Sequence, residues 1–199
     1  MSTEKKTVTI YAEASPNPES MKFVGNLSYL PQGVSVDYAD KEAAEKSPLA
    51  QELFDFSYIT RVFISSNFVS VTKTPETNWV EVISEVRTFM KKYLEEGKPV
   101  FTEMPKQNEI NVSSGEGQTE LEAKIIDLLN TYVRPAVEQD GGNIEFVSFD
   151  SGVVTVELQG SCSGCPSSTV TLKSGIESLL KRMVPEVTEV RADGVPDLH

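Results

Sequence analysis

The 199-residue sequence has few of the residues on which catalytic and metal-binding sites are usually built. It contains only two cysteines, Cys162 and Cys165, and one histidine, His199, at the end of the chain. A structural disulfide is not expected, because two cysteines at this spacing close almost no loop. We also find no acid or base near the cysteines that would suit an enzyme, so the sequence does not predict an enzyme.

Long apolar runs and excess positive charge are also missing. No apolar run approaches the roughly 20 residues that a membrane-spanning helix needs. Thirty acidic against 18 basic residues give a net charge of -12, which repels nucleic acid and anionic lipid. The first residues resemble neither a secretory signal nor an Arg-rich organellar presequence. We therefore expect a cytoplasmic protein with no nucleic acid or membrane partner.

The length suits two small domains better than one, because domains usually contain about 100 to 150 residues. Residues 103–118 lose the apolar periodicity and gather Ser, Gly and polar residues, which is typical of a flexible linker. The sequence thus predicts an α+β protein with two small α+β domains, at 1–102 and 119–199, joined by this linker.

In the first half, strands and helices are interleaved. Alternating residues predict strands at 6–13 and 33–39, and two more on either side of Ser65-Ser66-Asn67. Ser47 and Pro48 are suited to the N-cap and first position of a short helix. A longer helix follows within 77–98, with Val82, Val86, Phe89 and Tyr93 on one face and Gly97 as its stop.

The second half begins with a helix at 119–139. Thr119 and Glu122 are spaced as a capping box, Pro135 is expected to kink or tighten the last turn, and Asp140-Gly141-Gly142 ends the helix. A hairpin then turns at 150–152, and a final helix, Pro166–Met183, precedes a short strand at 186–192. The apolar faces of the two helices include Leu121, Ile125, Leu128, Leu129, Tyr132 and Val133, and Val170, Leu172, Ile176, Leu179, Leu180 and Met183.

Both cysteines lie in GSCSGCPSST, residues 160–169, directly before the final helix. Pro166 at the first helical position places the two sulfurs beside the positive end of the helix, which favours thiolates. Gly164 allows the turn that lets both sulfurs face one ion. Iron-sulfur clusters and structural zinc usually take four ligands, so one chain supplies half a site. A second copy would complete it and leave the metal easy to hand on.

Two other functions fit an isolated C-x-x-C pair. One is a dithiol-disulfide oxidoreductase, although a thioredoxin-type site usually follows a central strand of a βαβ unit, whereas here a hairpin comes first. The other is a structural dimer bridged by zinc through the same cysteines. Anaerobic iron and sulfide loading distinguishes the three, since only a cluster carrier would gain colour.

Several stretches resemble a known family. LLNTYVRPAVEQDGGNIEF and LQGSCSGCPSSTVTLKSGIESLLKRMVPEV are similar to the NifU-like C-terminal domain of the Nfu iron-sulfur carriers, over about residues 119–193. SPNPESMKF, SPLAQELF and FVSVTKTPETNW resemble the Nfu N-terminal domain. Asn143 departs from the family pattern, in which many relatives have Asp after the double glycine.

The resemblance implies a labile 4Fe-4S cluster, with 2Fe-2S as the alternative, bridged between chains by Cys162 and Cys165. It also implies a homodimer or higher homo-oligomer when loaded, supplied by upstream assembly proteins or assembling the cluster itself. The cluster would then pass to apo iron-sulfur proteins. The first domain is expected to recognise such client proteins.

Overall fold

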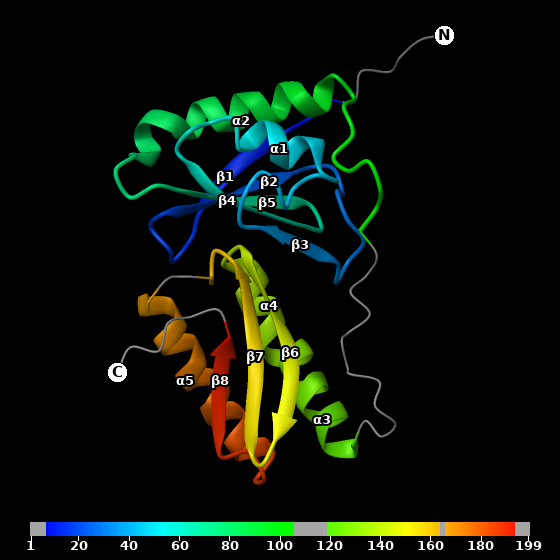
Figure 1. Ribbon diagram of the computed structural model, residues 1–199, viewed down its shortest axis with the longest axis vertical. Coiled ribbons are helices and arrows are strands. Elements are labelled where there is room, and N and C mark those ends of the chain that lie inside the picture. The colour runs from blue at the N-terminus through cyan, green and yellow to red at the C-terminus, as the bar shows by residue number, and fades with distance from the viewer. Residues whose placement is uncertain (1–6, 106–118, 164–165, 194–199) are drawn as a thin grey trace. The chain divides into compact units, whose positions relative to one another are not determined.

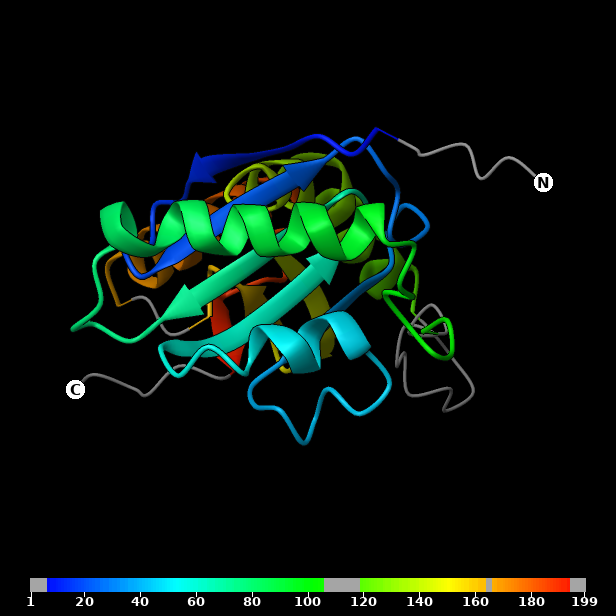
Figure 2. The same cartoon turned by 90° about the horizontal axis from the view of Figure 1, so that it is seen from above.

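The chain folds into two compact units, Met1–Gln107 and Asn108–His199. A computed structural model describes residues 7–105, 119–163 and 166–193, with only the backbone for 166–169 and 193 (Figures 1 and 2). Each unit contains its own sheet and helices, so the predicted α+β class with two domains is confirmed. The predicted linker falls largely on 106–118, outside the described residues, so the domain limits remain a prediction.

The first unit is a five-stranded antiparallel sheet in the order β1-β2-β5-β4-β3. Both helices lie over the same face of this sheet (Figure 2). The elements are β1 (Ile10–Ala14), β2 (Ser20–Gly25), β3 (Ser35–Tyr38), α1 (Pro48–Leu53), β4 (Ile59–Ser65), β5 (Phe68–Lys73) and α2 (Trp79–Glu95).

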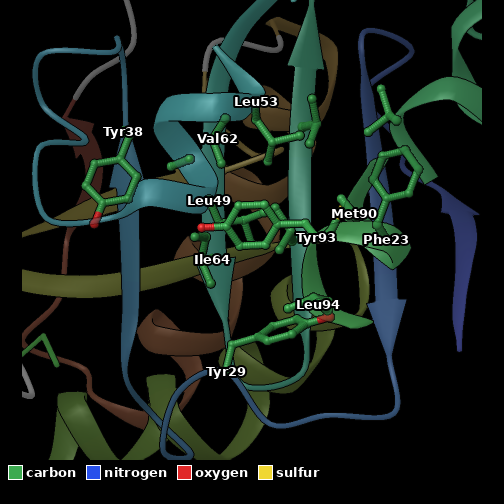
Figure 3. Close-up of a cluster of buried hydrophobic side chains, with 14 of the residues drawn as sticks. Phe23, Tyr29, Tyr38, Leu49, Leu53, Val62, Ile64, Met90, Tyr93 and Leu94 are labelled. Atoms are coloured by element: carbon green, nitrogen blue, oxygen red, sulfur yellow. The ribbon is translucent and has the colours of Figure 1, made fainter. Parts of the chain in front are cut away.

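The core of this unit lies between the helices and the sheet (Figure 3). Phe23, Leu49 and Met90 are fully buried there. The buried face of α2 is centred on Val86, Met90, Tyr93 and Leu94, close to the predicted face. Gly97 has a φ of 70°, as a residue that ends a helix often does, so the predicted stop is confirmed.

The predicted start of α1 is also confirmed. Ser47 is its N-cap, and the Oγ atom accepts a hydrogen bond from the Ala50 N–H at 3.3 Å. The same hydroxyl donates to the carbonyl of Val100 at 2.8 Å, which ties the helix to the segment after α2. Ser47 is fully buried, so both bonds are protected from water.

The second unit is a three-stranded sheet in the order β6-β7-β8, antiparallel between β6 and β7 and parallel between β7 and β8. Helix α5 forms the crossover that parallel neighbours require (Figure 1). The elements are α3 (Glu120–Leu128), a π-helix η1 (Leu129–Val133), α4 (Arg134–Gln139), β6 (Gly142–Asp150), β7 (Val153–Gly160), α5 (Pro166–Met183) and β8 (Glu189–Asp193).

The predicted helix at 119–139 forms, but a π-helical turn interrupts it. Its capping box is present: Thr119 Oγ1 accepts from the Glu122 N–H, and the Glu122 carboxylate accepts from the Thr119 N–H. Pro135, which has no N–H to donate, is the second residue of α4, the helix that follows the π turn. The wider turn changes which residues face the sheet, so Tyr132 is 59% exposed instead of buried.

The core of the second unit is apolar and continuous between the helices and the sheet. Helix α5 has the predicted bounds, but Val170 and Met183 of its predicted apolar face are exposed. The buried core residues are Ile125, Leu128, Leu129, Val133, Val137, Ile144, Val154, Val156, Leu158, Cys162, Ile176, Leu180, Val184, Val187 and Val190.

The dual hydrogen bonding of Ser47 gives a prediction about stability. Ser47→Ala removes an N-cap and a buried tertiary hydrogen bond, so it should lower the free energy of unfolding by about 2 kcal/mol. Asn78→Ala is the matched control, because Asn78 caps α2 from an exposed position and should cost about 1 kcal/mol. Urea unfolding of the full chain measures both, and equal losses would contradict the added role of the Val100 bond.

A carboxylate fixes the edge of the second sheet. Glu177 of α5 accepts hydrogen bonds from Lys181 Nζ at 2.5 Å and from the N–H of Val190, in the edge strand β8, at 3.1 Å. Together these bonds hold the pKa of Glu177 below its ordinary value near 4.5, with the Lys181 bond the larger cause. The ionised carboxylate therefore stabilises the docking of β8 against α5.

This lowered pKa has a defined pH signature. A group whose pKa falls on folding stabilises the protein above its unfolded pKa and loses that contribution as pH falls through the folded pKa. The difference in unfolding free energy between the wild type and Glu177→Gln should thus be full above the ordinary value near 4.5 and shrink below it. Urea unfolding across that range tests this, and a difference independent of pH would refute it.

Candidate metal centre

The cysteine loop begins where the β6–β7 hairpin ends. Gly142, the first residue of β6, lies opposite Gly160, the last residue of β7. Gly160 has a φ of 68°, a conformation that glycine adopts readily, and the chain turns there out of the sheet. The Ser163 N–H donates to the Gly160 carbonyl at 3.0 Å, which closes the turn around Cys162.

Cys162 is 6% exposed and packs into the core of the second unit. Three residues after the described part of the loop, α5 begins at Pro166, as the sequence predicted. The N-terminus of this 18-residue helix lies on the C-terminal side of the loop, and its partial positive charge attracts anions. Cys165 lies outside the described residues, so the predicted convergence of the two sulfurs remains a prediction.

Ser161 ties the loop to the end of α4. Its N–H donates to the carbonyl of Gly141 at 3.3 Å, and its Oγ atom donates to the carbonyl of Asp140 at 2.5 Å. Ser161 is 2% exposed, so these bonds are shielded from water. Sequence reasoning gave Ser161 no positioning role, because the bonds join residues about twenty positions apart.

Gly142 touches the cysteine itself. A Cβ atom at this position would lie 2.9 Å from Sγ of Cys162, 3.3 Å from its Cβ atom and 2.5 Å from the carbonyl oxygen of Gln159. Only glycine therefore allows the strand to approach the sulfur this closely. The sequence predicted helix termination as the main role of Asp140-Gly141-Gly142; Gly141, with a φ of 88°, fulfils it, whereas Gly142 makes room for Cys162.

Asn143, the residue that departs from the family pattern, is 2% exposed. Its Nδ2 atom donates across the hairpin to Oε1 of Gln159 at 3.5 Å. A carboxylate at this position could not donate that bond. The substitution therefore lies beside the loop without removing any sulfur ligand.

The local chemistry fits a soft metal. Thiolate sulfur is the ligand type that iron-sulfur clusters and zinc prefer, and the N-terminus of α5, which follows the loop, attracts negative charge. In the described part of the chain, no group of three or more His, Cys, Asp or Glu side chains could hold a metal ion. The described part of the loop thus presents one sulfur, and the described residues do not form a complete coordination sphere.

The role of Gly142 gives the third prediction. In a Cys165→Ser background, where Cys162 is the only thiol, Gly142→Ala should displace the loop and raise the rate at which iodoacetamide alkylates Cys162. The matched control is Gly175→Ala in α5, because a Cβ atom there meets nothing within 4 Å. That control should stabilise the helix by up to about 1 kcal/mol and leave alkylation unchanged. If Cys162 in the Gly142→Ala variant were alkylated at the wild-type rate, the contact between Gly142 and Cys162 would not hold the loop in place.

Comparison with known proteins yields two matching family models. The family described as "Scaffold protein Nfu/NifU N terminal" matches residues 10–97, and the family described as "NifU-like domain" matches residues 125–191. Among solved structures, that of the NifU-like protein from Saccharomyces cerevisiae covers 52% of this chain and 91% of its own, with a TM-score of 0.42 and 20% identity.

Curated relatives match along nearly the whole chain. The chain is 37% identical to "NFU1 iron-sulfur cluster scaffold homolog, mitochondrial" of Drosophila willistoni, over 94% of this chain and 64% of that protein. It is 38% identical to "NifU-like protein 4, mitochondrial" of Arabidopsis thaliana, over 96% and 68% respectively. A NifU-like protein of Schizosaccharomyces pombe is 35% identical, over 93% and 72%. The chain thus spans about two thirds of these relatives' length.

The predicted cytoplasmic location is corrected by these names. The Drosophila and Arabidopsis relatives are named as mitochondrial proteins, which points to mitochondria rather than the cytoplasm. The prediction rested on the composition of the first residues, which does not determine where a protein acts. On the separate question of membranes, none of the described helices combines the length and apolarity needed to span one.

Proposed function

Because the chain belongs to the family of Nfu and NifU-like iron-sulfur cluster scaffold proteins, we propose that two copies hold one 4Fe-4S cluster between them and deliver it to apo-proteins. The observation that carries this proposal is the setting of Cys162, a buried sulfur packed against Gly142 in the loop that precedes a long helix. The resemblance of the C-x-x-C stretch to the family supplies Cys165 as the second ligand.

The number of ligands favours a shared cluster. Each chain has two cysteines, whereas an iron-sulfur cluster is usually held by four thiolates. Two chains that meet at their cysteine loops would supply all four. The cluster would then lie at the interface between the copies, where it is accessible to an incoming protein.

This arrangement suits a carrier. Transfer requires that cysteines of the receiving protein replace the four thiolates one by one, so each bond to the carrier that breaks is matched by a bond to the receiver. Ser161 and Gly142 would keep the loop in one conformation through this exchange, because their contacts are made within the chain. The side chains of the loop bind and release the cluster and need no general acid or base.

The remaining assignments also belong to this proposal. The choice of 4Fe-4S over 2Fe-2S rests on the family, since thiolates bind both cluster types. We infer that upstream assembly proteins or assembly on the chain itself supply the cluster, and that apo iron-sulfur proteins receive it. Recognition of those client proteins is assigned to the first unit, as expected from the sequence.

Anaerobic loading with ferrous iron and sulfide tests the proposal. The wild type should gain a brown chromophore with acid-labile sulfide, and should pass it to an apo-ferredoxin. Cys162→Ser and Cys165→Ser should each lose colour and iron together. Ser161→Ala, which keeps both sulfurs, should bind the cluster but release it faster, because the loop is less firmly held.

Four outcomes would contradict the proposal or its choice of cluster. Full iron binding in both cysteine variants would show that Cys162 and Cys165 are not the ligands. A colourless protein that retains zinc would instead indicate a zinc-bridged dimer, and a colourless protein that reduces protein disulfides would indicate an oxidoreductase. An iron content half that of a 4Fe-4S cluster for each pair of chains would favour 2Fe-2S.

A further inference from the structure

A buried lysine at the end of the central strand of the first sheet forms no ion pair within the described residues. Lys73, the last residue of β5, is 6% exposed. Its ammonium group donates one hydrogen bond, at 3.3 Å, to the carbonyl of Thr74, and lies 5.9 Å from the centre of the Trp79 ring. Within the described residues, no carboxylate forms an ion pair with Lys73. An ammonium group carries three donors, so two remain to be satisfied.

Two other lysines lie over aromatic rings, and both are paired. Lys22 lies over a phenylalanine ring and forms an ion pair with Glu13 at 3.5 Å. Lys98 lies over a tyrosine ring and forms an ion pair with Glu52 at 3.5 Å. Lys73, at 6% exposure, is buried and has no ion pair with any carboxylate of the described residues. Burying an unpaired charge is costly, so this position favours a negatively charged partner.

A second hydrogen-bond donor beside Lys73 has no acceptor within the described residues. The indole Nε1 atom of Trp79 is buried without a hydrogen-bond partner in the described part of the chain. Trp79 is also the first residue of α2, a 17-residue helix whose N-terminus carries a partial positive charge. The ammonium group, the indole N–H and the helix end therefore all favour an anion.

Two loops flank Lys73. The main chain beside Lys73 bonds to the loop before β2, since the Lys73 N–H donates to the carbonyl of Glu19 at 2.9 Å. That loop exposes Pro16 and Pro18, and the loop between β5 and α2 exposes Pro75 and Glu76. The lysine thus lies at an end of the sheet between two exposed loops.

We propose that Lys73 and Trp79 bind a carboxylate group, carried by a small organic acid or by the C-terminus of a polypeptide. A carboxylate neutralises the ammonium group and has two oxygens, so one oxygen can accept from the ammonium group and the other from the indole N–H. The site lies in the first unit and uses none of the cysteine loop, so it is independent of cluster binding.

The sole tryptophan of the chain is Trp79, so its fluorescence and its single indole N–H resonance report on this site directly. Sodium acetate should shift both in a saturable manner in the full-length apo-protein, whereas sodium chloride at equal ionic strength should not. Lys73→Met, which keeps the apolar stem, should weaken acetate binding at least about tenfold, as expected for losing a charge-assisted hydrogen bond.

Lys98→Met is the matched control, because it also removes a lysine from an aromatic ring but leaves Lys73 in place, and it should bind acetate like the wild type. A short peptide with a free C-terminus identifies the source of the carboxylate. If the peptide binds more tightly than acetate and its C-terminal amide does not bind, the natural ligand is a polypeptide end. If the peptide binds only as tightly as acetate, the natural ligand is a small acid. No saturable response to either carboxylate would overturn the proposal, as would an undiminished response in Lys73→Met. If that variant does not fold, equal binding of the peptide and its amide to the wild type would overturn it.

Discussion

The cysteine loop lies against Gly142 so closely that no β-carbon would fit between them, and the position of the candidate site depends on this contact. The hairpin register creates it, because Gly142 and Gly160 are paired at the open end of β6 and β7. Ser161 then donates hydrogen bonds to the residues that follow α4. Contacts around Cys162 thus join the loop to the hairpin and to the segment that follows α4.

A firmly held loop is compatible with a loosely held cargo. The contacts that fix Cys162 are made within one chain, whereas the proposed cluster would depend on sulfurs from two chains. Breaking the pair would therefore release the cluster without disturbing the fold of either copy. Exposed Val170, one turn into α5, adds apolar surface near the start of that helix.

Local signals in the sequence predicted much of the fold. Caps at Ser47 and Thr119 and the bounds of α5 were correct, because each depends on neighbouring residues. Strand β2 was not recognised, since the short run around Lys22 is interrupted by charge and becomes a strand by pairing on both sides with β1 and β5.

The cysteines of the candidate site were found from their spacing, but their surroundings were not. The contact of Gly142 and the hydrogen bonds of Ser161 join residues far apart in the sequence and are set by tertiary structure. Native mass spectrometry of the anaerobically loaded protein tests the central claim most directly. We expect the mass of one cluster on the dimer and none on the monomer. A monomer that retains a whole cluster would contradict the sharing of the cluster between two chains.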